Sequence, residues 1–164
     1  MAASRRWRVA GRWGALATQG RWVDVPARGT LAAASVSHAV VAEAQTAYLA
    51  GHNTWGQLGQ GRTSVWGTAR IALPDRIVSA AAGLGFTCLA TSDALYVSGT
   101  NVRGQMGLDQ ERGSLSFQRL ALPAVRSVCA GLDHMLVLAG AQVWGCGINS
   151  AWQLGGRSLA RSRA

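Results

Sequence analysis

The sequence repeats itself with a period of 48 residues, and this feature constrains the fold more than any other. The stretch GHNTWGQLGQG (51–61) aligns without a gap with GTNVRGQMGLD (99–109) and with GINSAWQLGGR (147–157). Self-similarity at a fixed period of about 20 to 50 residues is typical of solenoids, propellers and other arrays. The glycine-rich stretch is therefore one copy of a repeated structural part.

Four positions are identical in all three copies of this stretch. They are Gly51, Gly99 and Gly147; Asn53, Asn101 and Asn149; Gln57, Gln105 and Gln153; and Gly59, Gly107 and Gly155. Glycine allows backbone bends that a Cβ forbids, asparagine adopts left-handed conformations or bonds to its own backbone, and a glutamine amide can bridge two backbone groups. A phosphate-binding loop is not indicated, because GxxxxGK[ST] is absent and no helix is predicted to follow. We interpret the twelve residues as a structural repeat motif.

The rest of each repeat has the pattern of short β-strands. In the third copy, the apolar runs VRSVCA (125–130), HMLVLA (134–139) and VWGCG (143–147) are separated by GLD and GAQ. Such runs, bounded by glycine and aspartate, predict strands joined by hairpins. The connections between copies each contain Leu-Pro, which suits an edge strand better than a central one. Four strands per repeat, with the last at the edge, predict a propeller blade.

The two half-motifs together resemble the regulator of chromosome condensation (RCC1-like) repeat family. The matching segments are AGLDHMLVL with VWGCGINSAWQLG, AGLGFTCLA with LYVSGTNVRGQMG, and VSHAVVA with AYLAGHNTWGQLG. Three residues depart from the family pattern: Ser35 replaces a glycine, Phe86 a histidine and Trp152 a glycine. The resemblance implies an all-β fold of RCC1-like β-propeller blades, with three clear four-stranded repeats in an incomplete ring.

We expect three regions along the chain. Residues 1–24 form a basic N-terminal segment, residues 25–156 contain the repeats, and residues 157–164 form a basic tail. The motif cores are residues 31–61, 79–109 and 127–156. The N-terminal segment has two interpretations: residues 7–20 resemble a degenerate half-blade, whereas an arginine-rich segment without acids also resembles a mitochondrial targeting sequence.

An arc of three blades exposes a strand edge and an apolar flank at each end. Propellers close with four to eight blades, and the resemblance implies a ring of about seven. We therefore expect either a truncated product or isoform, or an arc that another chain completes.

The net charge of +9 resides mainly at the two ends of the chain. All 16 basic residues are arginines; five precede Asp24 and three follow Gly156, which leaves eight arginines against all seven acids between them. Arginine-rich ends could contact nucleic acid or chromatin through phosphates. No apolar run is long enough to span a membrane, so no membrane partner is expected.

Cysteine and histidine residues do not indicate a metal site. Cys88, Cys129 and Cys146 show no C-x-x-C spacing, which favours reduced thiols in an intracellular compartment. His38 and His134 share a repeat position without a second ligand beside either, and we expect each to bond within its own blade. We expect no metal and no cofactor.

The sequence predicts a non-catalytic protein-interaction module or scaffold, because no nucleophile with a base and no carboxylate pair stands out. Trp55, Arg103 and Trp152 are the candidate partner contacts, because exposed tryptophan and arginine often anchor interfaces. Two alternatives stay open. The family resemblance implies guanine nucleotide exchange on a small GTPase, and the arginine-rich ends suggest chromatin or nucleic-acid contact. A cytoplasmic or nuclear location is expected, or a mitochondrial one if the N-terminus is a targeting segment.

Overall fold

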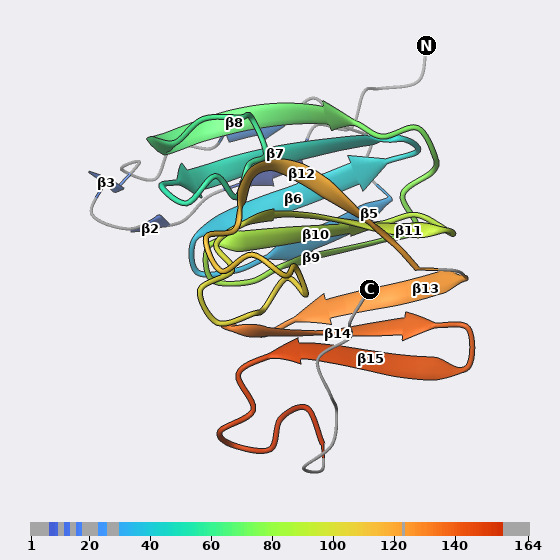
Figure 1. Ribbon diagram of the computed structural model, residues 1–164. Helices are drawn as coiled ribbons and strands as arrows, with labels where there is room; N and C mark the ends of the chain where they lie inside the picture. The colour runs from blue at the N-terminus through green and yellow to red at the C-terminus, as the bar shows by residue number, and fades with distance from the viewer. Residues whose placement is uncertain are drawn as a thin grey trace.

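The computed structural model describes residues 30–122 and 124–155, together with the backbone of four short strands between residues 7 and 25. The described chain contains strands and turns but no helix. Its main body is three antiparallel sheets placed one after another, from β8 at one side to β15 at the other (Figure 1). The all-β prediction is confirmed.

Each sheet is one repeat of the sequence, which we call a blade. Blade 1 has the order β5 (Leu31–Ala34), β6 (His38–Glu43), β7 (Thr46–Asn53) and β8 (Ser64–Ala72). Blade 2 has the order β9 (Ser79–Ala82), β10 (Phe86–Ala90), β11 (Ala94–Gly99) and β12 (Ser114–Ala121). Blade 3 has β13 (Val125–Ala130), β14 (His134–Ala139) and β15 (Gln142–Gly147). The expected runs of the third copy coincide with these last three strands to within one residue.

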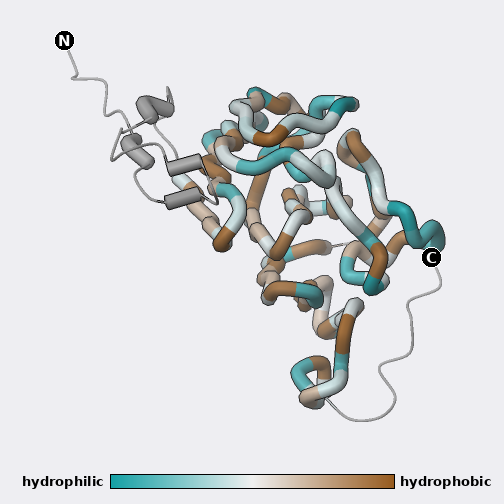
Figure 2. Tube along the Cα trace, turned by 90° about the vertical axis from the view of Figure 1, so that its left-hand side faces the viewer, coloured by the Kyte–Doolittle hydropathy of each residue, from teal (hydrophilic) through white to brown (hydrophobic). Residues whose placement is uncertain are grey.

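The hydrophobic core lies between the blades. One buried cluster joins blades 1 and 2 through side chains such as Leu49 and Leu89, and a second joins blades 2 and 3 through Phe86 and Val137. The innermost strands are also in contact, since β9 packs against both β5 and β13. Apolar segments are accordingly spread over all three sheets (Figure 2). Each blade therefore depends on its neighbours for a core, as repeat architectures do.

The proline between the first two repeats lies beside an edge strand, as the sequence pattern predicted. Pro74 follows β8, the outermost strand of blade 1, and so occupies the connection to the next blade. Pro123, which has the same place after β12, lies outside the described residues. In the first connection the proline thus lies just after the edge strand and five residues before β9 begins.

Blade 3 differs from the other two at its outer edge. β7 pairs with β8 and β11 pairs with β12, but no described strand pairs with the outer edge of β15. The expectation of four strands therefore holds for the first two blades, whereas three strands of the third are described. The basic tail, residues 157–164, lies outside the described residues.

The N-terminal segment contains two separate pairs of short strands. β1 (Trp7–Val9) pairs antiparallel with β4 (Val23–Val25), and β2 (Arg12–Trp13) pairs with β3 (Leu16–Ala17). The first pairing is the one that a half-blade would need, since β7 and β8 pair in the same way. The half-blade and targeting interpretations both remain predictions.

Candidate partner-binding loops

Three glycine-rich loops lie at the same end of the three blades. Each follows the third strand of its blade, namely β7, β11 or β15, and these strands end on the same side of the sheets (Figure 1). The twelve motif residues lie in these loops or at the ends of the strands that lead into them. This end of the molecule also carries the three residues predicted to contact a partner.

The motif asparagine holds each loop closed from within. Asn101 Oδ1 accepts a hydrogen bond from Met106 N at 2.8 Å, and its Nδ2 donates to Leu108 O at 3.0 Å and to Gln110 O at 2.7 Å. Asn53 and Asn149 accept the equivalent backbone bond at 3.0 and 2.8 Å. None of the three asparagines has a positive φ. Their side chains connect distant parts of the loop, so neither left-handed backbone nor a short Asx-turn explains them.

The motif glutamine binds one backbone group where two were expected. Gln57, Gln105 and Gln153 each accept the amide N–H two residues earlier, at distances of 3.0, 2.8 and 2.9 Å. The Nε2 atoms of Gln57 and Gln105 are buried without a hydrogen-bond partner. The amide therefore fixes the turn through its oxygen.

The first motif glycine is required because two backbones approach closely. Gly51, Gly99 and Gly147 have φ values of 136°, 117° and 105°. A Cβ at Gly51 would lie 2.6 Å from the Cα of His38, and a Cβ at Gly99 would lie 2.7 Å from the Cα of Phe86. Real Cβ atoms do not approach other atoms so closely. Only glycine fits these positions, where the pairing of the third and fourth strands also shifts register.

Blades 1 and 2 are joined by a chain of polar side chains. Ser37 Oγ lies 2.9 Å from His38 Nδ1, His38 Nε2 lies 2.6 Å from Thr87 Oγ1, and Thr87 Oγ1 donates to Gln57 O at 2.7 Å. Because the Thr87 hydroxyl donates its proton to Gln57, His38 Nε2 must carry a proton. Burial disfavours the charged imidazolium and lowers the pKa of His38 from 6.5 to about 4. The ring is therefore neutral near pH 7, and its Nδ1 accepts a hydrogen bond from Ser37 Oγ. His38 thus bonds to the neighbouring turn of its own blade, as predicted, and its ring also reaches Thr87 of the next blade.

Blades 2 and 3 are joined at the equivalent positions by apolar and sulfur-containing side chains. Phe86 takes the place of His38, Met135 that of Thr87, and Cys146 that of Ser98. Ser98 Oγ donates to Gly56 O at 2.7 Å in the first interface, and Cys146 Sγ contacts Gln105 O at 3.2 Å in the second. Burial raises the pKa of Cys146 to about 12, so this thiol stays protonated near neutral pH.

The three predicted partner contacts differ in what they touch. Trp55 is 45% exposed, and its ring packs on Gly85 of blade 2, where a Cβ would lie 3.0 Å from the Trp55 Cδ2 atom. Arg103, in the same repeat position, is exposed. Trp152 is 57% exposed with a φ of 60°. It does not share the position of the other two, because it occupies the place of Gly56.

In its described part, this end of the molecule presents two tryptophans and an arginine to solvent. Among the described residues, no three histidine, cysteine or acidic side chains gather to hold a metal ion. The structure shows no helix, in the part it describes, that could cross a membrane. Of the arginine-rich ends, expected to contact nucleic acid, the structure describes only the backbone of a few N-terminal residues, among them Arg8 and Arg12.

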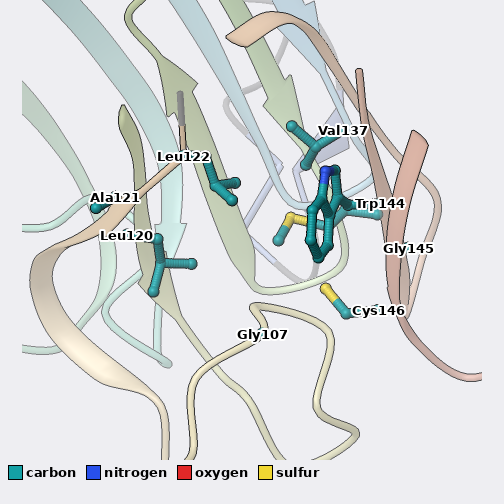
Figure 3. A pocket seen from close by; sticks show the side chains of 9 residues that line it. Gly107, Leu120, Ala121, Leu122, Val137, Trp144, Gly145 and Cys146 are labelled. Carbon is teal, nitrogen blue, oxygen red and sulfur yellow. The ribbon is translucent and has the colours of Figure 1, made fainter. Parts of the chain in front are cut away.

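A small apolar cavity of about 40 Å³ lies between blades 2 and 3. Leu120 and Leu122 line one side, Val137, Trp144 and Cys146 line the other, and Gly107 lies below them (Figure 3). The cavity offers shape and apolar surface but no charged group. It is suited to an apolar side chain.

Comparison with known proteins identifies the fold. No protein-family model matches the sequence, and a search of curated proteins finds no match either. The crystal structure of human WBSCR16, an RCC1-like propeller, is similar with a TM-score of 0.63 and 21% sequence identity. The match covers 77% of this chain and 37% of that one, so this chain spans about a third of its structural neighbour. The chain therefore has the all-β fold of RCC1-like propeller blades, which do not close into a barrel within the described residues.

Proposed function

We propose that the chain is a non-catalytic protein-interaction module whose glycine-rich loops contact a partner protein. The observation that carries this proposal is the conformation of Trp152. Its φ of 60° is one that bulky side chains rarely adopt, and the equivalent positions in the other two blades hold glycine, with φ values of 79° and 70°. The fold therefore has no need of a tryptophan at this place.

Trp152 costs stability and exposes apolar surface at the same time. Left-handed backbone costs an L-residue about 1–2 kcal/mol, and exposed apolar surface adds nothing to folding. Tryptophan is among the residues that contribute most to binding when a partner buries them. Retaining Trp152 at a position made for glycine is readily explained if the ring contacts a partner.

Trp55 and Arg103 extend the same surface along the arc. Both follow the motif asparagine by two residues and are exposed, although Trp55 also covers the backbone of blade 2. Together with Trp152 they place two aromatic rings and a guanidinium at one end of the blades. Such a surface suits a folded protein partner, because exposed tryptophan and arginine are the residue types that anchor protein interfaces.

The test is partner capture with a variant that keeps the fold. The full chain is immobilised and exposed to lysate, and recovered proteins are compared between the wild type and Trp152→Gly. Glycine relieves the strained backbone, so folding should be preserved or improved. Val65→Ala, at an exposed position of blade 1, is the control. We expect loss of specific partners with Trp152→Gly alone, and equal recovery from all three proteins would contradict the proposal.

A nucleotide-release assay separates simple binding from exchange activity. Release of labelled GDP from a panel of small GTPases is measured with and without the protein at micromolar concentration. A binding module leaves the release rate unchanged. Acceleration would instead support the exchange factor that the family resemblance implies.

A further inference from the structure

The sulfur-containing side chains that the structure describes all lie in blades 2 and 3. Blade 1, residues 30–72, contains neither cysteine nor methionine, whereas residues 79–147 contain three cysteines and two methionines. Four of these five side chains pack in the buried cluster between blades 2 and 3, namely Cys88, Met106, Met135 and Cys146. The contact between blades 2 and 3 is therefore rich in sulfur.

Three of the sulfur atoms come from three strands and converge at this contact. The Cys88 thiol of β10 donates to Met135 Sδ of β14, with 3.4 Å between the two sulfur atoms. Cys146 of β15 is the register partner of Met135, so these two side chains lie on the same face of blade 3. Both also line the cavity between the blades (Figure 3).

The two buried thiols influence each other. Burial raises the pKa of Cys88 well above its ordinary value, and the neighbouring thiols of Cys146 and Cys129 raise it further. Both Cys88 and Cys146 are therefore protonated near neutral pH, and the Cys88 proton lies between two sulfur atoms. A metal ion reverses this preference, because a thiol that coordinates a metal gives up its proton.

The contact between blades 1 and 2 shows that the fold does not need sulfur at these places. At an offset of 48 residues, the positions of Cys88, Met135 and Cys146 hold Val40, Thr87 and Ser98. All three are fully buried; the valine packs in the apolar cluster, and the two hydroxyls donate to backbone carbonyls of blade 1. One aliphatic and two hydroxyl side chains thus serve the same geometry. Sulfur at all three places points to a use beyond packing.

We propose that Cys88, Met135 and Cys146 bind one Cu(I) ion between blades 2 and 3. Soft thiolate and thioether sulfur atoms are the ligands that select monovalent copper. Metal–sulfur bonds of about 2.3 Å, the length in zinc–thiolate sites, let one ion bridge two sulfur atoms 3.4 Å apart. The unbranched Met135 side chain can adjust to the ion by rotation about its own bonds.

Binding leaves the oxidation states of copper and sulfur unchanged. The S–H bond of each cysteine that coordinates the ion breaks, the proton passes to solvent, and a Cu–S bond forms. Among residues 30–122 and 124–155, no three histidine, cysteine or acidic side chains gather as a zinc site would require. The expectation of no metal rested on the missing C-x-x-C spacing. Here the ligands come from three strands, so their spacing along the chain has no such signature.

The test is a Cu(I) titration of the full, reduced chain under anaerobic conditions, in competition with the chromophoric chelator bicinchoninate. Three single variants each remove one ligand: Cys88→Ala, Met135→Leu and Cys146→Ser. Cys129→Ser is the control, because it removes an exposed thiol of the same blade. Zn²⁺ is the comparison ion. The triple variant Cys88→Val, Met135→Thr, Cys146→Ser copies the contact between blades 1 and 2, and urea unfolding shows whether each variant folds.

We expect the wild type and Cys129→Ser to bind one equivalent of Cu(I). Each ligand variant should bind at least about tenfold more weakly, since even residues that only orient a metal ligand contribute about 10- to 100-fold to affinity. Cu(I) should also raise the urea midpoint of the wild type, because it binds the folded state, and should leave that of the triple variant unchanged.

Unchanged Cu(I) affinity in Met135→Leu overturns the proposal, and this variant keeps the volume of the side chain, so the fold should survive. Loss of binding in Cys129→Ser also overturns it, because the ion would then lie on an exposed thiol. Zn²⁺ binding as tight as Cu(I) binding contradicts the choice of ion. Trp152→Gly should leave Cu(I) binding unchanged, so this proposal and the proposed partner surface can fail separately.

Discussion

Replacing His38 by phenylalanine should remove a defined part of the pH dependence of stability. Phenylalanine is the residue that blade 2 carries at the same position, where Phe86 is fully buried. His38 is itself fully buried and is neutral in the folded protein, because burial lowers its pKa from 6.5 to about 4. The variant keeps the shape of an aromatic ring but binds no proton.

The magnitude follows from the two pKa values. The unfolded chain binds a proton at His38 near pH 6.5 and the folded chain only near pH 4, so stability is fully present above 6.5 and falls as the pH decreases. Linkage gives a loss of about 2 kcal/mol at pH 5 and about 3 kcal/mol at pH 4, relative to pH 8. With a urea m-value of about 2 kcal/mol/M, the first figure corresponds to a midpoint lower by about 1 M.

Urea unfolding followed by tryptophan fluorescence at pH 8, 6.5 and 5 provides the measurement. All other side chains are the same in both proteins, so the difference between wild type and His38→Phe isolates His38. We expect the wild type to lose about 2 kcal/mol more than the variant between pH 8 and 5. The double variant His38→Phe, Thr87→Met, which copies the second interface, controls for the lost hydrogen bond. Identical pH dependence in the wild type and both variants would refute the reasoning.

Three further predictions concern the repeat motif and the thiols. Gly99→Ala should destabilise the protein by about 3 kcal/mol or more in urea unfolding, because the new Cβ meets the backbone of β10 and the backbone is strained; a loss under 1 kcal/mol would contradict the close approach. Asn101→Ala should cost about 3 kcal/mol by the same measurement, since it removes three hydrogen bonds of a buried side chain, and Asn149→Ala, at a half-buried position, should cost less. Cys129, which is exposed, should react first with Ellman's reagent at pH 8, whereas Cys88, which is buried, should react only on unfolding; rapid modification of Cys88 would contradict its burial.

The strands of the blades were predictable because their signals are local and repeated. Apolar runs between glycines predict hairpins within any single copy. Because the copies align at an offset of 48 residues, the strand positions predicted in one copy also apply to the others. The strand run proposed at 143–147 accordingly begins one residue after β15 does. The need for glycine at positions such as Gly99 was also expected, although only the structure shows that the cause is a neighbouring backbone.

Contacts between blades were not predictable in the same way. His38 bonds to Ser37 within its own blade, as expected, but its second partner, Thr87, lies 49 residues further along, on a face that the sequence does not specify. The packing of Leu115 and Phe117 of β12 against the glycine-rich loop of blade 1 was missed for a related reason. Leu115 and Phe117 lie in the connection between repeats, whose residues differ between copies, so no repeated signal marks them. Trp152 was recognised as a departure from glycine, but its strained backbone became evident only in the structure.

Hydrogen–deuterium exchange across the third strand of each blade tests the central claim most directly. Amides of Gln142–Gly147 should exchange faster than those of Ala94–Gly99, because among the described strands only the latter is paired on both edges. Protection of β15 equal to that of β11 would contradict this account of the blades.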